Sequence, residues 1–308
     1  MLKEIEGYRN FLNQKRHAKT TAKSYLHEIK IFCDFYVGCL GHEGQSWGGI
    51  TVDDARQYRN HLVDLDKKVT TINHAITSMR LFYDYLMIKG VVESNPFRDI
   101  NLFLHERETP QVLNDKEAAE LIGAPMREYE AIIDSLAGQK RKAPGPVLFL
   151  RDQLILEIFY YAGLKTCELM RLKDHDVDCR TNTICIRNKH RPNEGRVLPL
   201  PECVIRSFEE YLAKREKVWP YRNAPALFLS NNGKPITKRS IGRMMKHYLM
   251  KSGLDPRISP QTLRATFALR AIKQGASPET IMYILGYESL STAEIYINLV
   301  KRGISIRP

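Results

Sequence analysis

The C-terminal part of this 308-residue sequence contains the pattern that most restricts its fold. Residues 261–268 read Gln-Thr-Leu-Arg-Ala-Thr-Phe-Ala, which places Arg264 at the start of a predicted helix. Gly286 then marks a helix end, because glycine is the commonest residue directly after a last helical turn. Ser291 is a suitable cap for the next helix, which carries Tyr296 just inside its start. The spacing therefore predicts a helical region with an arginine and a tyrosine near the beginnings of two helices.

This pattern resembles the C-terminal signature of the tyrosine recombinases, the family of the phage integrases and the Xer resolvases. The usual form is H-x-L-R-H-T-F-A, followed by L-G-H/W-x-S-x-x-T-x-x-x-Y. The chain keeps the arginine, the Thr-Phe-Ala, the Leu-Gly and three later positions, Ser289, Thr292 and Tyr296. It departs from the signature at three polar positions. Gln261 and Ala265 stand where relatives have histidine, and Tyr287 stands where they have histidine or tryptophan. By the resemblance, Gln261 and Tyr287 occupy catalytic positions.

The charge of the chain indicates a polyanionic partner. The formal net charge is +12 and the pI is about 9.4. Nucleic acid is the first candidate, because lysines and arginines that neutralise phosphates gain affinity from counterion release. A basic but merely solvated surface is the alternative that composition alone leaves open.

Cysteine usage and hydropathy predict a cytoplasmic protein without a metal or other cofactor. The six cysteines form no C-x-x-C pair, which is typical of free thiols in a reducing compartment. The sequence begins with charged residues and lacks the apolar stretch of a signal peptide. No apolar run reaches the length of a membrane span, so we expect no contact with a membrane.

The chain is long enough for two domains, each with its own core. Residues 1–105 have the apolar periodicity of an all-helical unit, and the third of four expected helices opens with the capping pair Thr51 and Asp54. Residues 106–111 form a polar linker, and a second domain is expected over residues 112–308.

The N-terminal unit is similar to the helical core-binding (SAM-like) domain of the tyrosine recombinases. The resemblance implies that Thr21, Lys23, Asn73 and His74 face DNA. Solvated positions on the surface of a helix are an equally good interpretation of these four residues.

The second domain is predicted to be mainly helical with a small sheet. Residues 183–187 and 196–200 are strand candidates that flank a polar turn, and a further short strand is expected over residues 226–230. The expected fold class is therefore mainly α with a small antiparallel sheet (α+β), consisting of a helical core-binding domain and a tyrosine-recombinase catalytic domain.

Cutting a phosphodiester needs a nucleophile, cations on the non-bridging oxygens and an acid for the leaving oxygen. By the resemblance, Tyr296 is the nucleophile and Arg264 grips the phosphate through its planar, two-pronged donor group. Lys189 lies in the hairpin turn where the family carries a mobile lysine, a proposed general acid, and Arg191 adds to the positive charge of this turn. A solvated turn is the alternative for both residues.

Lys165 is the most consequential departure from the family. The segment 162–169, Ala-Gly-Leu-Lys-Thr-Cys-Glu-Leu, resembles the family's T-G-L-R-x-S-E-L, whose arginine is the first phosphate ligand. Lysine keeps the charge and loses the bidentate geometry. Three explanations remain open: a substitution made to trap a DNA complex, a slow natural recombinase, or a degenerate paralogue that binds DNA without cutting it.

The resemblance implies site-specific recombination of double-stranded DNA through a 3′-phosphotyrosyl intermediate on Tyr296. It also implies self-association to a tetramer on DNA and a nucleoid-associated location. Three alternatives are a non-catalytic accessory protein of a recombination system, a type IB topoisomerase and a basic helical scaffold unrelated to DNA.

Overall fold

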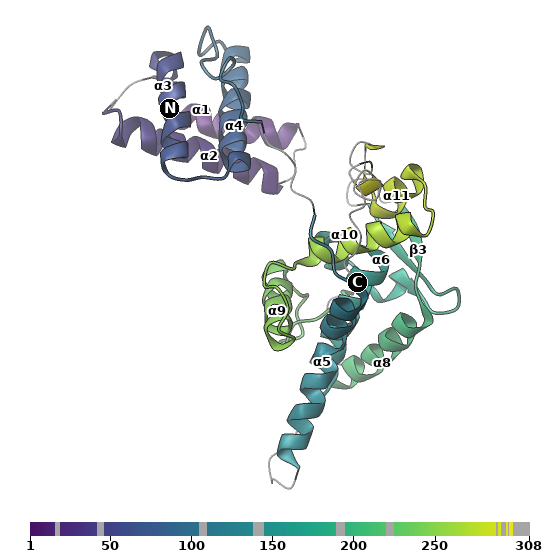
Figure 1. Cartoon of the computed structure of the whole chain (residues 1–308). Helices are drawn as coiled ribbons and strands as arrows, with labels where there is room; N and C mark the ends of the chain where they lie inside the picture. Colours follow the sequence, from purple (N-terminus) through teal and green to yellow (C-terminus); the bar gives the residue numbers. More distant parts are fainter. Residues whose placement is uncertain are drawn as a thin grey trace. The chain divides into compact units, whose positions relative to one another are not determined.

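A computed structural model describes residues 1–15, 19–41, 46–104, 110–137, 145–188, 195–219, 225–287, 289–290, 294 and 296–297. The chain divides into two compact units, Met1–Glu108 and Thr109–Pro308 (Figure 1). The linker expected over residues 106–111 falls at this division. Most of it, residues 106–109, lies outside the described residues, so the linker stays a prediction.

The N-terminal unit is helical. Its elements, labelled in part in Figure 1, are α1 (Leu2–Gln14), α2 (Lys19–Gly38), the 3-10 turn η1 (Trp47–Gly49), α3 (Val52–Asp64) and α4 (Val69–Ile88). The core is rich in aromatic rings, and Phe32 from α2 meets Tyr58 from α3 edge to face at 5.0 Å between ring centroids. Such pairs add directional contacts to the hydrophobic burial that holds α1–α4 together.

The second unit is mainly helical and contains one small sheet. Its elements are α5 (Asp115–Leu136), α6 (Val147–Ala162), α7 (Thr166–Leu169), η2 (Asp174–Asp176), β1 (Val177–Asp178), β2 (Thr183–Arg187), β3 (Gly195–Pro199), α8 (Glu202–Val218), α9 (Lys238–Lys251), α10 (Pro260–Lys273) and α11 (Pro278–Leu285). The strands form an antiparallel sheet in the order β1-β2-β3, with Ile184 opposite Leu198.

Helix α6 is the centre of the second unit. It packs against α5, α8 and α10 and is buried on nearly every side, as expected for a helix surrounded by others. It ends at Gly163, whose positive φ of 59° is a conformation that favours glycine. This end of α6 and the start of α10 bring together segments that are about a hundred residues apart in the sequence.

The predicted fold class is confirmed, but the expected strand over residues 226–230 is wrong. Ala226 and Leu229 form only isolated bridges, with Lys173 and Pro235. The main-chain carbonyls of Leu227 and Leu229 instead accept hydrogen bonds from the buried guanidinium groups of Arg215 and Arg151, at 2.7 Å each. Side chains thus occupy acceptors that a neighbouring strand would need.

Among the described residues, no helix combines the length and the apolar character that crossing a bilayer requires.

The cap of α3 provides a test of the N-terminal unit. The Thr51 hydroxyl accepts a hydrogen bond from the Asp54 amide at 3.2 Å, and the Asp54 carboxylate accepts one from the Thr51 amide at 2.8 Å. Thr51→Ala removes the first of these bonds, so we expect the free energy of unfolding to fall by about 1 kcal/mol. Thr51→Ser keeps the oxygen and is the control. Equal urea midpoints for Thr51→Ala and the wild type would contradict the role of the cap.

Candidate active site

Arg264 lies at the start of α10 because the cap of this helix is well defined. The Ser259 hydroxyl accepts a hydrogen bond from the Thr262 amide, and Pro260 occupies the first helical position. The Arg264 side chain is 1% exposed. It donates a hydrogen bond to the Gly163 carbonyl at 2.6 Å and another to the Leu285 carbonyl, so it joins the ends of α6 and α11.

Lys165 follows the end of α6. Gly163 turns the chain, and the Lys165 amide then donates to the Glu168 carboxylate at 2.8 Å. The Lys165 ammonium donates to the Gly286 carbonyl at 3.0 Å, directly after α11. The two cations to which the resemblance assigns phosphate binding therefore both reach the C-terminal end of the same helix.

Gly286 ends α11 in the left-handed conformation, with a φ of 59°. The Tyr287 amide donates back to the Met282 carbonyl at 3.0 Å, which reverses the chain and directs Tyr287 into the site. The Tyr287 ring lies 4.9 Å from the Arg264 guanidinium carbon and 5.9 Å from the Lys165 ammonium. Both cations thus contact one aromatic ring.

Tyr296 is 6% exposed, and its hydroxyl lies 3.3 Å from that of Tyr287. Burial raises the pKa of Tyr296 above the usual tyrosine value, and the hydrogen bond with Tyr287 adds to the shift. The Arg264 charge and the Gln261 side chain act in the opposite direction on this pKa. In the protein alone, Tyr296 is therefore a neutral phenol at physiological pH.

The structure brings five of the six predicted catalytic residues together: Lys165, Gln261, Arg264, Tyr287 and Tyr296. Lys189 lies outside the described residues, as does Arg191. Both fall between β2 and β3 in the sequence. Ala265, where relatives have histidine, is buried in a small apolar cluster that includes Tyr296. The catalytic roles of these residues stay predictions.

The four residues of the N-terminal unit that are predicted to face DNA differ in their burial and in their hydrogen bonds. The side-chain amide of Asn73 donates to the Phe103 carbonyl at 2.8 Å and accepts from the Phe103 main-chain amide at 2.9 Å. It therefore ties α4 to the segment that contains Phe103. His74 shares a hydrogen bond of 2.8 Å with the Ser24 hydroxyl. Thr21 is half-buried and Lys23 is exposed. Contact with DNA stays a prediction for all four residues.

One ion pair beside the site was not singled out from the sequence. Arg196 on β3 and Glu168 on α7 form two parallel hydrogen bonds of 3.0 and 2.9 Å, and both side chains are buried. Burial alone would raise the pKa of Glu168, but the hydrogen bonds and charge of Arg196 hold it below its usual value. The feature of the sequence that could have identified Arg196 as buried is the alternation of β3, in which Arg196 and Leu198 both occupy inward positions.

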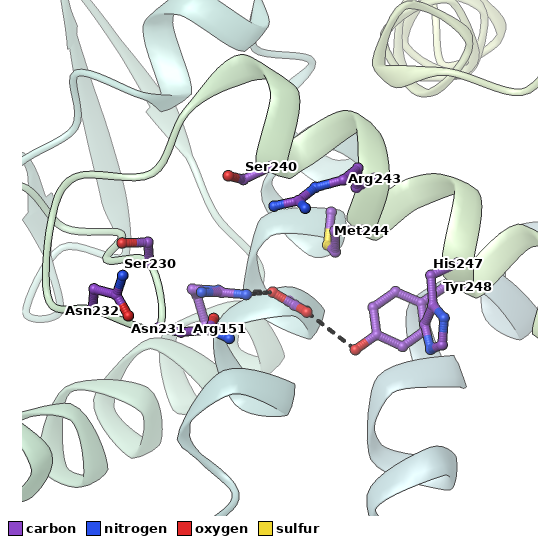
Figure 2. A pocket seen from close by; sticks show the side chains of 10 residues that line it. Arg151, Ser230, Asn231, Asn232, Ser240, Arg243, Met244, His247 and Tyr248 are labelled. Atoms are coloured by element: carbon purple, nitrogen blue, oxygen red, sulfur yellow. Dashed lines mark hydrogen bonds and ion pairs between the residues drawn. The ribbon is translucent and has the colours of Figure 1, made fainter.

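A cleft of about 580 Å³ lies apart from these residues, between α6, α9 and residues 230–232 (Figure 2). The buried side chains that line it bond to one another. Arg151 donates to Asp152 at 2.7 Å, and the Tyr248 hydroxyl donates to the same carboxylate at 3.1 Å (Figure 2). None of the predicted catalytic residues lines the cleft. Within the described ranges, no group of three or more acidic, histidine or cysteine side chains is arranged to hold a metal ion.

Comparison with known proteins gives the same assignment over most of the chain. Residues 127–302 match the phage integrase family, and residues 5–90 match the N-terminal SAM-like domain of phage integrases. The tyrosine recombinase XerC of Oceanobacillus iheyensis is 29% identical over 302 residues, which cover 96% of this chain and 92% of the relative. XerC of Thermodesulfovibrio yellowstonii is 28% identical over 299 residues, covering 94% and 90%.

Two solved structures share the fold at low sequence identity. The XerH site-specific recombinase bound to a palindromic difH substrate has a TM-score of 0.72 at 16% identity, covering 92% of this chain and 77% of that one. The Tn1549 transposon integrase in complex with circular intermediate DNA has a TM-score of 0.69 at 18% identity, covering 98% and 99%. Because the family match spans more than half of the sequence, this chain belongs to the phage integrase family of site-specific tyrosine recombinases.

Proposed function

We propose that this chain cuts and rejoins double-stranded DNA at a specific site through a 3′-phosphotyrosyl intermediate on Tyr296. The observation that carries the proposal is the pairing of the Tyr296 and Tyr287 hydroxyls, 3.3 Å apart, beside two buried or half-buried cations. A phosphate bound by these cations would lie next to the Tyr296 hydroxyl. Attack of the Tyr296 oxygen on the phosphate would break the bond to the 5′-oxygen, form the 3′-phosphotyrosyl link and release a 5′-hydroxyl. A 5′-hydroxyl from the partner strand would then attack the phosphotyrosyl phosphorus and release the tyrosine, so the link keeps the energy of the broken bond.

Arg264 is suited to hold the scissile phosphate. A guanidinium group has five N–H donors. Two are used on the Gly163 and Leu285 carbonyls, which leaves three for phosphate oxygens. Since those carbonyls fix the orientation of the side chain, little reorganisation is needed when charge develops in the transition state.

Lys165 supplies a second cation in a weaker form. One of its three N–H donors is used on the Gly286 carbonyl, and the other two can reach a single oxygen but cannot form the bidentate pair of an arginine. The loss of one aligned donor costs about 3 kcal/mol, or a factor of about a hundred in rate. The proposed enzyme is therefore slow.

The reaction needs two proton transfers, one from Tyr296 and one to the leaving 5′-oxygen, and different residues are proposed for each. Tyr296 has to lose its proton, and Gln261 can hydrogen-bond to the phenol but cannot carry the proton away. Lys189, which falls between β2 and β3 in the sequence, is the proposed acid for the leaving 5′-oxygen. Arg191, two residues further on, is proposed to contact DNA together with Thr21, Lys23, Asn73 and His74.

The partners proposed for the chain are double-stranded recombination-site DNA and other copies of itself. The net charge of +12 supports the first, as do the DNA-bound structures of XerH and the Tn1549 integrase. Assembly into a tetramer on DNA and association with the nucleoid belong to the same proposal. A catalytically degenerate accessory protein is the second candidate, and Lys165 and Gln261 are the observations that favour it.

Tyr296→Phe tests the nucleophile. A DNA duplex with a nick beside the scissile phosphate releases the leaving fragment and traps the covalent intermediate. We expect the wild type to form a covalent protein–DNA adduct that resists denaturation, and Tyr296→Phe to form none while binding DNA within about threefold of wild type. An adduct formed by Tyr296→Phe would overturn the assignment. Adducts absent from both the wild type and Lys165→Arg would favour the accessory protein.

Lys165→Arg tests the weakened phosphate ligand. We expect the rate of adduct formation to rise by about tenfold to a hundredfold, because arginine restores an aligned pair of donors. Lys165→Met removes the charge at similar length and should lower the rate. If Lys165→Arg is as slow as Lys165→Met, the site is built around lysine and the argument for a missing donor is wrong.

The raised pKa of Tyr296 predicts the pH dependence of the reaction. Below its pKa, the phenolate fraction increases tenfold for each pH unit. Because burial and Tyr287 keep this pKa above the usual value, the adduct rate should still rise at about pH 9, without a plateau near neutrality. Initial rates measured with the nicked duplex from about pH 6 to about pH 9 check this. A rate that is independent of pH over this range would show that loss of the phenol proton does not limit the reaction.

A further inference from the structure

Within the part of the chain that the structure describes, three consecutive carbonyl groups at the C-terminal end of α11 accept no main-chain hydrogen bond. The left-handed Gly286 lets its own amide bond to the Tyr283 carbonyl, and the Tyr287 amide bonds to the Met282 carbonyl, at 3.0 Å each. This is the usual pair of bonds at a glycine helix end. It leaves the carbonyls of Ile284, Leu285 and Gly286, which need other donors.

Each of these three carbonyls accepts a hydrogen bond from a different cationic side chain. Arg196 Nε donates to the Ile284 carbonyl at 2.8 Å, Arg264 donates to the Leu285 carbonyl, and Lys165 Nζ donates to the Gly286 carbonyl at 3.0 Å. The C-terminal end of a helix carries partial negative charge, so it favours cations. The position of Tyr287, one residue further on, depends on this arrangement.

Arg196 differs from the other two cations because all three of its guanidinium nitrogens are occupied. Nη1 and Nη2 bond to the two carboxylate oxygens of Glu168, and Nε bonds to the Ile284 carbonyl. The residue is 8% exposed. A Cβ added to Gly286 would lie 2.7 Å from Nη1, so the helix end rests directly on the guanidinium group. Because its charge is already paired with the Glu168 carboxylate, we do not propose Arg196 as a phosphate ligand.

Glu168 connects Arg196 to the neighbouring cation. Its Oε2 accepts from Arg196 Nη2 at 2.9 Å and from the Lys165 amide at 2.8 Å. One buried ion pair therefore fixes both the main chain of Lys165 and the end of α11. From these contacts we infer that Arg196 is a positioning residue, which acts through Glu168 and the end of α11 to hold Lys165 and Tyr287 against Tyr296.

This inference rests on the proposed function, and its first test uses the same nicked duplex. Arg196→Lys keeps the charge, but a single ammonium cannot hold both Glu168 oxygens and the Ile284 carbonyl in the same geometry. We expect the rate of adduct formation at saturating DNA to fall about a hundredfold or more, while the dissociation constant for DNA changes by less than about threefold. An adduct rate within about threefold of wild type would overturn the inference and leave the proposed function standing.

Arg215→Lys is the matched control. Arg215 is also buried, and it forms two hydrogen bonds with Asp174, at 2.9 and 2.8 Å, and one with the Leu227 carbonyl. It contacts none of the catalytic positions through these bonds. At the same folded fraction, Arg215→Lys should change the adduct rate by less than about threefold. A loss as large as that of Arg196→Lys would show a general effect of removing a buried ion pair, and the inference would be wrong.

Hydrogen exchange gives a measurement that does not depend on activity. In Arg196→Lys, the amides of residues 284–287 should exchange about tenfold faster than in the wild type, and those of Arg215→Lys should not. If Arg196→Lys does not fold, Glu168→Gln removes the same ion pair and should give both results. Unchanged exchange at the end of α11 would overturn the inference. A wild type that forms no adduct would defeat the proposed function alone, since the exchange result would still decide the contact.

Discussion

The candidate site depends on one constraint: the last carbonyl groups of α11 belong to buried or half-buried residues and need hydrogen-bond donors. Burying a main-chain carbonyl group without a hydrogen-bond donor lowers the stability of the fold. In this chain cationic side chains, rather than a further main-chain turn, supply the donors. The cations in turn gain acceptors that replace water. The end of α11 thus holds Arg264 and Lys165, the cations proposed to bind the phosphate, and also positions Tyr287.

The burial of Arg264 follows from the same arrangement. An isolated buried guanidinium group would be strongly destabilising. Here the C-terminal ends of α6 and α11 both point their carbonyls at it, and the Tyr287 ring covers one side. Carbonyl dipoles stabilise the cation without neutralising its charge, whereas a directly bound carboxylate would compete with the phosphate. Glu168, the nearby acid, is instead fully engaged by Arg196 and the Lys165 amide.

Much of this organisation was predictable from the sequence, because it is encoded locally. Gly163 and Gly286 end helices, Ser259 with Pro260 begins one, and the alternation around the turn near Lys189 predicts a hairpin. What the sequence did not reveal depends on contacts between distant segments. The run 226–230 has the composition of a strand, yet Arg151 and Arg215 take its carbonyls. Likewise, the pairing of Arg196 with Glu168 cannot be read from either local segment, and the two bonds from Asn73 to Phe103 are not visible in the helical period of α4.

The structure gives Lys165 a role that charge alone does not explain. Its ammonium donates to the Gly286 carbonyl and lies 5.9 Å from the centre of the Tyr287 ring, at the helix end against which Arg196 also packs. Lysine at this position therefore helps to hold the end of α11 and the residue that follows it. One of its three N–H donors is used for this bond, and the other two cannot form the paired bonds of a guanidinium group on a phosphate. A site built in this way gains a fixed helix end and loses one aligned donor in the transition state.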